Sequence, residues 1–474
     1  MPSFWRPAGL CVLLIAVCGT IPVLAQAPTP DELALPAPVA GSIAQTAFQT
    51  EQEPFVEAVE ETADEPDYPL RANFGDGFRL ETADRQYQLR IRVLNQVDGK
   101  LFIPTDQEPA RSGLYIPRFR FYFEGQLTDL FQYELSVQRS VEGVFDVLDA
   151  NVNFHVNDGF QVRVGRALVP YSFAWYDHLE QYYIAPERGL FPLNFGLARQ
   201  SQVVAHGRLF DDELQYAIGA TFGQLAGLAD TNSTRDGLAY VNLRPWLHSE
   251  TLPLLRFLNL GGSFAAGQQV DPGTPLPLRT SLQTSENDEA AQAASSIFLE
   301  YNPTAISLGN RSQAAAHAAW YVGGLSLETE WYTASFTAKP DPAAKSVTVP
   351  VAGYDATLGW FVTGETIEGR GPVNPLRPFT SPTGFGPGAL ELFGRYSELD
   401  IGNRIFTAGL ADPTKWTNRA AITDIGWNWY LNRFVRITFD WQHAMYADPV
   451  LLNEAKDLRS RHNDLYWLRC QLYF

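Results

Sequence analysis

Long hydrophobic runs and cysteines are both scarce in this chain of 474 residues. After the first 25 residues no stretch offers about 18 consecutive apolar residues, which excludes a transmembrane helix in the rest of the chain. Cys11 and Cys18 lie in the leader, so Cys470 stands alone and an internal disulfide is excluded. If the chain spans a membrane, it must therefore do so as a closed barrel, because only a closed barrel or a helix satisfies the backbone in lipid.

Lysine is scarce too, with five lysines among the 35 basic residues, and the formal net charge is −18. Proteins that bind nucleic acid carry a basic face, so this balance argues against a nucleic-acid partner. The chain also lacks HExxH, GxSxG and P-loop motifs, and its seven histidines show no local signature with Ser or Asp. An outer-membrane lipase or protease is the competing enzyme class, but we expect no enzyme activity, no cofactor and no bound metal.

The first residues have the pattern of a secretory signal peptide. Arg6 precedes a largely apolar stretch, and Val23 and Ala25 supply small residues at positions −3 and −1 of a cleavage site. The segment 26–70 follows with ten acidic residues, no Lys or Arg, and many Ala and Pro residues. Such a segment is typical of disorder. The predicted organisation is a signal peptide over 1–25, an acidic disordered segment over 26–70 and a folded domain over 71–474.

From about residue 86 onward, apolar and polar residues alternate. In QYQLRIRV, residues 86–93, one face carries Tyr and aliphatic side chains and the other carries Gln and Arg. The same pattern recurs in RFRFYFEGQL (118–127) and in the C-terminal LYWLRCQLYF (465–474). Each segment is about ten residues long, which is the length a tilted strand needs to cross a bilayer. Tight turns such as 157–159 alternate with longer Gly/Pro-rich connections.

This pattern predicts an all-β fold, a transmembrane antiparallel β-barrel of about 16 strands with short periplasmic turns and long extracellular loops, in the bacterial outer membrane. A β-sandwich would have shorter strands, and no repeat of 20–50 residues indicates a solenoid. Two segments fit the pattern poorly. In 266–311 the strand boundaries are ambiguous, and 364–387 is a long Pro/Gly-rich stretch on the side expected to carry short turns. The terminal strand ending at Phe474 resembles the signal that the barrel-assembly machinery reads.

The polar face of the strands is expected to line a water-filled lumen. Arginine is always charged and offers a fork that matches oxyanions, so a column of arginines could pass an anion from site to site. In the alternative, these arginines pair with neighbouring acids and stiffen the wall. The predicted pore-lining residues are Arg90, Arg92, Arg118, Arg120, Glu124, Arg163, Arg395, Arg436, Asp440 and Arg469.

Four stretches give the sequence a family resemblance. They are VRVGRALVPYSF (162–173), GYDATLGWFVTGE (353–365), ALELFGRYSELDI (389–401) and IGWNWYLNRFVRITFDWQHAMY (425–446). Together with the C-terminal strand, they make residues 70–474 similar to the phosphate-selective porin O and P family. This resemblance implies a sixteen-stranded, homotrimeric outer-membrane porin whose third extracellular loop folds inward.

Counting strands places 169–200 in the position of that third loop. Within it, the residues expected to form the constriction are Tyr171, Asp177, His178, Glu180, Tyr182 and Arg188. Counting Asp177, Glu180 and Glu187 against Arg188 and Arg199 gives a formal balance of 2 − 3 = −1. A strongly phosphate-selective pore is expected to be more basic than this, so the family resemblance does not decide the solute.

We therefore predict an outer-membrane porin for passive diffusion of small hydrophilic solutes, with anions preferred and phosphate as a candidate. One alternative is a general or weakly cation-preferring porin, which the acidic loop favours. Another is a non-catalytic structural anchor of the outer membrane. The expected partners are outer-membrane lipid, small solutes, two further copies of the chain in a homotrimer and the barrel-assembly machinery.

Overall fold

The structure is a computed structural model. It describes residues 69–141, 143, 145–222, 235–284, 289–379 and 384–474. The predicted signal peptide and nearly all of the predicted acidic segment fall on residues 1–68, outside the described residues, and stay predictions. The first described strand begins at Leu70.

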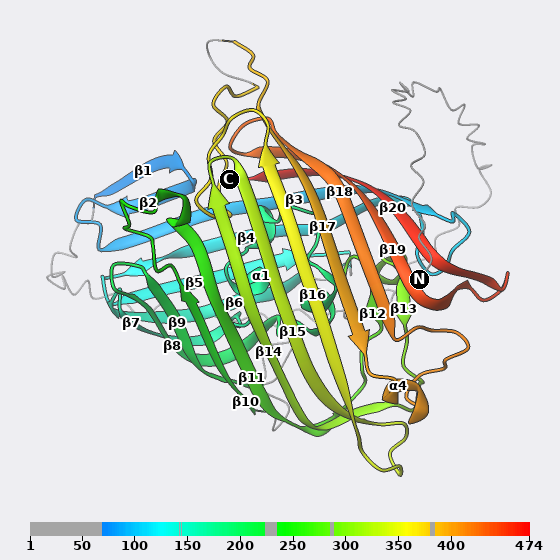
Figure 1. Ribbon diagram of the computed structural model, residues 1–474. Coiled ribbons are helices and arrows are strands. Elements are labelled where there is room, and N and C mark those ends of the chain that lie inside the picture. The colour runs from blue at the N-terminus through cyan, green and yellow to red at the C-terminus, as the bar shows by residue number, and fades with distance from the viewer. Residues whose placement is uncertain (1–68, 142, 144, 223–234, 285–288, 380–383) are drawn as a thin grey trace, which may run out of the picture. The chain divides into compact units, whose positions relative to one another are not determined.

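Sixteen antiparallel strands form a closed barrel (Figure 1). Each strand pairs with its neighbours in chain order, and the last strand pairs with the first, from Asp464 opposite Ile103 to Tyr473 opposite Leu94. The predicted fold class and strand number are confirmed. The barrel strands are β3 (Tyr87–Ile103), β4 (Gly113–Leu127), β5 (Phe131–Arg139), β6 (Phe145–Asn157), β7 (Phe160–Leu168), β8 (Arg199–Leu209), β9 (Leu214–Thr221), β10 (Arg235–Leu243), β11 (Phe257–Gly273), β14 (Ile306–Val322), β15 (Leu325–Lys339), β16 (Val347–Phe361), β17 (Ala389–Ile401), β18 (Arg419–Tyr430), β19 (Val435–Asn453) and β20 (Leu458–Tyr473).

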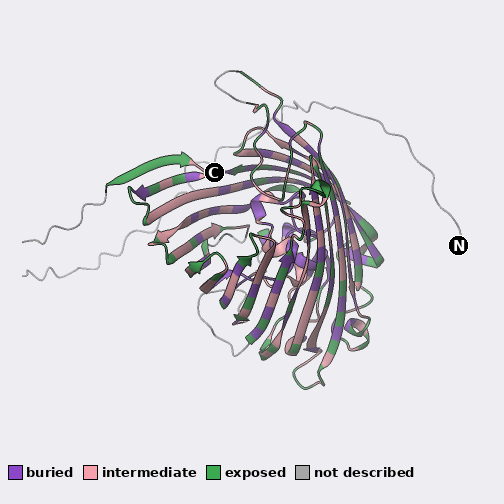
Figure 2. Ribbon diagram, turned by 60° about the vertical axis from the view of Figure 1, so that its left-hand side comes forward, coloured by how far each residue is buried: buried purple, intermediate pink, exposed green. Residues whose placement is uncertain are grey.

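The alternation of side chains decides which face of each strand points outward. In β20, Tyr466 and Leu468 are 39% and 50% exposed, whereas their neighbours Trp467 and Arg469 are 1% and 0% exposed. Exposed and buried residues alternate in this way along many of the barrel strands (Figure 2). Because the outward residues are mainly apolar and carry no protein layer in the described part of the chain, they suit a lipid surrounding.

The two ends of the barrel differ in their connections. At one end most turns are short, such as 158–159 between β6 and β7, and at the other end lie long loops such as 169–198 and 274–305. The short-turn end has two longer connections, 244–256 between β10 and β11 and 362–388 between β16 and β17. Within the described residues, no helix is both long enough and apolar enough to cross a membrane. The remaining elements are α1 (Phe173–Tyr176), η1 (Glu180–Tyr182), α2 (Leu190–Phe195), η2 (Pro253–Leu255), β12 (Leu278–Arg279), α3 (Glu289–Ala293), β13 (Ile297–Leu299) and α4 (Arg404–Thr407).

The ambiguous segment 266–311 proves to be mostly loop. The barrel strand β11 extends to Gly273, and the next barrel strand begins at Ile306. Between them β13 pairs with β12 in a separate two-stranded sheet inside the loop. The apolar residues of β13 are thus buried by other loops and do not form a barrel strand.

A short hairpin precedes the barrel and continues the sheet at the junction between the last strand and the first. It consists of β1 (Leu70–Gly75) and β2 (Gly77–Thr82), and β2 pairs with Gln88–Ile91 of β3. That part of β3 lies beyond the end of β20, and Phe474, which follows β20, exchanges backbone hydrogen bonds with Val93. The ring of Phe474 lies 6.0 and 5.9 Å from the two phenylalanine rings of the hairpin.

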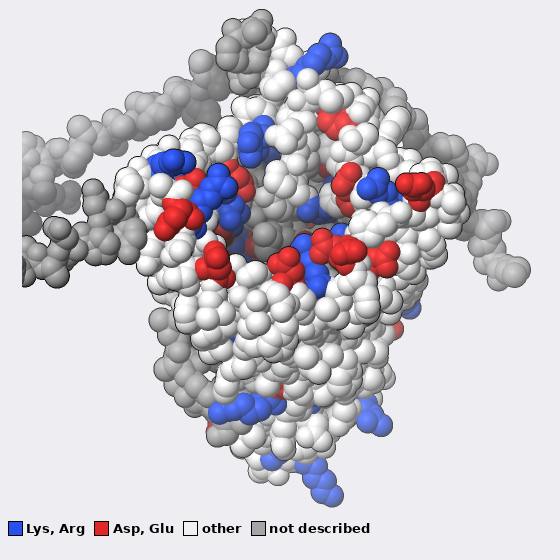
Figure 3. Space-filling model, turned by 90° about the vertical axis from the view of Figure 1, so that its left-hand side faces the viewer, with Lys and Arg blue, Asp and Glu red and all other residues white. Residues whose placement is uncertain are grey.

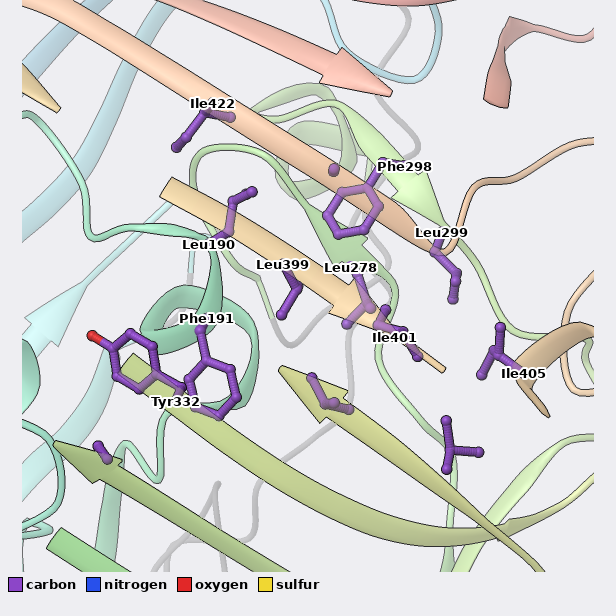
Figure 4. Close-up of a cluster of buried hydrophobic side chains, with 14 of the residues drawn as sticks. Leu190, Phe191, Leu278, Phe298, Leu299, Tyr332, Leu399, Ile401, Ile405 and Ile422 are labelled. Carbon is purple, nitrogen blue, oxygen red and sulfur yellow. The ribbon is translucent and has the colours of Figure 1, made fainter. Parts of the chain in front are cut away.

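The largest hydrophobic core joins the third loop to the barrel wall and to the other long loops (Figure 4). Leu190 and Phe191 of α2 belong to this cluster together with residues of β12, β13, β15, β17, β18 and α4. Phe191 stacks on Tyr332 of β15 with ring centroids 4.4 Å apart. Interior packing of this kind fixes a loop in one arrangement, because each buried side chain fills a space of its own shape.

Candidate functional site in the barrel lumen

The third loop, residues 169–198, enters the barrel between its fifth and sixth strands, which is the position expected from strand counting. Its first turn is held by Glu330 of β15, whose carboxylate accepts hydrogen bonds from the backbone N–H groups of Phe173 (2.9 Å) and Ala174 (3.1 Å). An acid beside the unpaired N–H groups at the start of a helix stabilises that end. The loop therefore begins from a fixed point on the wall.

Two carboxylates fix the middle of the loop to arginines of the wall. Arg118 of β4 donates both terminal nitrogens to Glu187 at 2.7 Å. Arg469 of β20 donates to the same carboxylate at 3.0 Å and forms a two-pronged pair with Asp98. Arg120 of β4 contacts Glu180 at 3.1 Å in the same manner. These groups are buried, and charged hydrogen bonds that are buried and paired are strong and directional.

Other arginines hold the backbone of the same segment. Arg436 of β19 donates to the carbonyl oxygen of Tyr183 at 2.8 Å, and Arg395 of β17 donates to the carbonyl oxygen of Glu187. Arg395 also pairs with Asp424 of β18 at 2.8 Å. These contacts fix the loop to β4 and to strands β17 to β20, and Arg199 of β8 fixes it to a further strand by pairing with Glu180 at 2.9 Å.

Electrostatics keep the central carboxylate ionised. Burial alone would raise the pKa of Glu187, but the guanidinium groups of Arg118 and Arg469 outweigh burial and lower that pKa from 4.5 to about 2. Arg120 and Arg199 likewise outweigh burial and hold the pKa of Glu180 well below its ordinary value. The two acids therefore stay charged and paired at neutral pH.

We expect the single-channel conductance to change little from about pH 7 to about pH 4.5 and to rise only as the pH falls toward 2. A group whose pKa is lowered on folding contributes stability above its unfolded pKa, and this contribution is lost as the pH falls through the folded pKa. Conductance recorded against pH in planar bilayers measures the effect. A transition centred near pH 4.5 would contradict the ion pairs of Glu187.

The predicted pore-lining arginines therefore divide into two groups. Arg118, Arg120, Arg395, Arg436 and Arg469 are buried, and all five contact the third loop. For this group the structure shows the alternative arrangement, in which arginines pair with other groups and stiffen the wall, and it does not show a column of unpaired guanidinium groups.

The remaining predicted lining residues lie nearer the short-turn end, with one exception. Arg92 pairs with Glu124, and Arg90 lies 3.6 Å from the same carboxylate. Arg163 of β7 lines a cavity described below. The exception is Asp440 of β19, which is fully buried and whose carboxylate oxygens accept no hydrogen bond within the described chain.

The predicted constriction residues all lie on the third loop inside the barrel, but most of them pack against other side chains. Tyr171 belongs to the large core, and the hydroxyl of Tyr240 donates to Asp177. Burial lowers the pKa of His178, which lies 3.7 Å from Glu328.

The last two constriction residues contact aromatic rings. Tyr182 meets the ring of Tyr473 with centroids 5.8 Å apart. The guanidinium carbon of Arg188 lies 3.2 Å from the ring centre of Trp175, a cation–π contact, and the group also donates to backbone carbonyls of the loop. Arg188 therefore has a role in holding the loop together.

Arg370 was not predicted from the sequence. It lies in the segment 362–388, which contains the Pro/Gly-rich stretch 364–387 that fits the strand pattern poorly. This arginine is buried and pairs with Glu328 of β15 at 2.9 Å and Glu391 of β17 at 2.6 Å. Its guanidinium also donates to the hydroxyl of Ser326. The segment therefore anchors to the inside of the wall from the short-turn end. Only the unexpected length of the segment, which contains Arg370 and Arg377, could have indicated this.

Two cavities flank the third loop. One of about 390 Å³ at the short-turn end is lined by residues of β3 to β8, among them Arg90, Glu134, Arg163 and His206. Figure 3 looks onto the end that carries β1 and β2 and shows a hollow with basic and acidic side chains around it. The second cavity, of about 280 Å³, lies toward the long loops and is lined by Gln200 and residues of β10, β11, β14 and β15. In the described part of the chain, no group of three His, Cys, Asp or Glu residues is arranged to hold a metal.

The family model "Phosphate-selective porin O and P" matches residues 89–474. Among solved structures, the in-vitro folded OmpT of Vibrio cholerae in its trimer form is 10% identical, with 81% of this chain and 99% of that chain covered and a TM-score of 0.47. The anion-selective porin from Comamonas acidovorans is 14% identical over 82% of this chain and all of that chain, with a TM-score of 0.48.

The outer membrane channel DcaP of Acinetobacter baumannii is 10% identical over 84% of this chain and all of that chain, with a TM-score of 0.47. No curated protein matches the chain. The match of the family model covers more than half of the chain and includes all the barrel strands except the first two residues of β3. The chain belongs to the phosphate-selective porin O and P family and is a porin of the bacterial outer membrane.

Proposed function

We propose that this porin passes small hydrophilic solutes by passive diffusion, with a weak preference for anions, and performs no bond chemistry. The observation that carries the proposal is the position of the third loop. Five wall arginines hold it against β4 and β17 to β20, while the polar cavity at the periplasmic end is lined by β3 to β8. This arrangement supports a solute path that includes the polar cavity beside β3 to β8.

The path is expected to be narrowest along β8. His206 lines the periplasmic cavity and Gln200 lines the extracellular one. Between them on the inner face lie Gln202 and Val204, which are 1% and 2% exposed. Because Val204 lies in the same hydrophobic cluster as Val169 and Tyr171 of the third loop, little open space remains along this part of β8, and we expect a small conductance.

The anion preference depends on a small excess of positive charge at the periplasmic cavity. Arg90 and Arg163 line it together with Glu124 and Glu134, but Glu124 is already paired with Arg92. Arg163 has no carboxylate within ion-pair distance in the described chain. A guanidinium that has no carboxylate within ion-pair distance attracts anions without holding them tightly, which a conducting path requires. Phosphate is one candidate solute among such anions.

The substitution Arg163→Gln is expected to shift the zero-current potential toward cation selectivity, because it removes a positive charge from the lining of the cavity. The measurement uses planar bilayers under a salt gradient, first with potassium chloride and then with added phosphate. Arg433→Gln serves as the matched control, since Arg433 is exposed in the turn between β18 and β19. A cation-selective wild type, or an unchanged potential in Arg163→Gln, would reject the anion preference while leaving the porin intact.

The assembly of the protein is also part of this proposal. The family resemblance implies a homotrimer embedded in outer-membrane lipid and inserted by the barrel-assembly machinery through the strand that ends at Phe474. The exposed apolar outer face supports contact with lipid and with other copies of the chain. Chemical cross-linking of the folded protein in detergent tests the trimer, and bands that stop at the monomer would reject it.

A further inference from the structure

The cavity at the extracellular end has a lining unlike that of the periplasmic one. Among the described residues that line it, Asp236 and Arg311 alone are charged. Arg311 donates from two nitrogens to both carboxylate oxygens of Asp236, at 3.1 and 2.6 Å, so the two charges offset each other. The rest of the lining is apolar or uncharged. Because no net charge faces this space, it is not built to select an ion.

One wall of the cavity is an aromatic corner. Phe336 of β15 stands at its centre, with the ring of Phe195 from α2 at 6.1 Å and the ring of Tyr301 at 6.4 Å between centroids. Leu197 and Leu276 extend the apolar surface beside the three rings. Such a corner presents aromatic faces and edges to a flat ring, which prefers offset or edge contacts of this geometry.

Two amide groups at the same cavity have unused hydrogen-bonding capacity. Gln200 is 1% exposed, and its Nε2 donates to the carbonyl oxygen of Leu197 while its Oε1 has no partner in the described chain. The Nε2 of Gln313 of β14 is buried and also has no partner there. The residues that carry this unpaired acceptor and this unpaired donor both line the cavity. Buried polar groups without partners are rare, and a bound molecule is one way to satisfy them.

We infer that this cavity is a binding site for an uncharged solute with one flat ring and a hydroxylated part, which is the chemistry of nucleosides and aryl glycosides. The ring packs against the corner of Phe195, Tyr301 and Phe336, and hydroxyl or amide groups pair with Gln200 and Gln313. The volume of about 280 Å³ suits a molecule of two rings and is at the small end of ligand pockets. The site is independent of the proposed anion preference, because its lining is neutral.

Isothermal titration of the folded porin in detergent tests the site, with uridine and phenyl β-D-glucoside as probes. We expect at least one probe to bind and its phosphorylated counterpart, uridine 5′-phosphate in the case of uridine, to bind more weakly. Which probe binds distinguishes nucleosides from glycosides. The substitution Phe336→Leu keeps an apolar side chain and should weaken binding about tenfold. Gln313→Leu should weaken it about fivefold.

Tyr133→Leu is the matched control, because Tyr133 lines the periplasmic cavity, and it should leave the affinity unchanged. Electrophoretic mobility before and after heating establishes that each variant is folded. Absence of binding by both probes to folded wild-type protein would overturn the inference. So would equal affinity in Phe336→Leu, or binding of uridine 5′-phosphate as tight as that of uridine.

Discussion

Replacing Glu187 with Gln is expected to release the third loop from the wall and to raise the single-channel conductance with added current noise. In the wild type, this carboxylate accepts hydrogen bonds from Arg118 and Arg469, and all three side chains are buried. The amide removes the negative charge that two buried guanidinium groups share. Breaking a buried ion pair from one side costs about 3–5 kcal/mol, because it leaves a buried charge without its partner. This cost falls on the contact that fixes the middle of the loop.

Planar-bilayer conductance and limited proteolysis of the folded porin measure this effect together. Glu398→Gln is the control, because Glu398 pairs with Arg419 in a more exposed position, and pairs of this kind contribute about 0–1 kcal/mol. The double variant Glu187→Gln, Arg118→Met removes one of the stranded charges and should recover part of the wild-type behaviour. Conductance and protease resistance equal to wild type in Glu187→Gln would show that the loop is held by its apolar core alone.

The second large effect is expected for Arg370→Met, which should detach the segment 362–388 from the lumen. Arg370 is the shared partner of Glu328 and Glu391, and its loss leaves two buried carboxylates without that cation. A comparable cost of about 3–5 kcal/mol is expected. Because two uncompensated negative charges then line the periplasmic end, the zero-current potential should also move toward cation selectivity.

Arg377→Met is the matched control for this variant. It changes the same charge in the same segment, but Arg377 is exposed. Reversal potential and conductance in planar bilayers separate the two consequences, since release of the segment raises conductance and the stranded acids change selectivity. Identical values for Arg370→Met and Arg377→Met would remove the anchoring role of Arg370.

The barrel could be predicted from the sequence because its signal is local. A period of two in β20 places Leu468 outward and Arg469 inward whatever the neighbouring strands are, so each strand reports its own two faces. The third loop could also be placed, because counting strands needs only their order. The stretch SIFLEYN (296–302), within the ambiguous segment 266–311, could not be assigned for the same reason, since a short apolar run buried by loops has the local composition of a barrel strand.

The chemistry of the lumen could not be predicted in this way, because it depends on contacts between residues far apart in the chain. Glu187 and Arg469 are 282 positions apart and meet only when the loop folds across the closed barrel. Counting charges within the loop gave −1 and indicated an acidic constriction, but Glu180 and Glu187 face arginines of the wall. Arg370 carried no local pattern at all, and its partners lie on two different strands.

The hairpin of β1 and β2 has a consequence for how the barrel closes. The edge of β3 has two occupants, with β2 along Gln88–Ile91 and β20 from Leu94 onward. Phe474 ends against the phenylalanines of the hairpin, so β20 cannot slide further toward the start of β3 without displacing β2. The hairpin therefore limits how far the last strand, β20, can extend along β3. Since the stagger between first and last strands sets the tilt and diameter of a barrel, this small element at the rim helps to set the width of the whole pore.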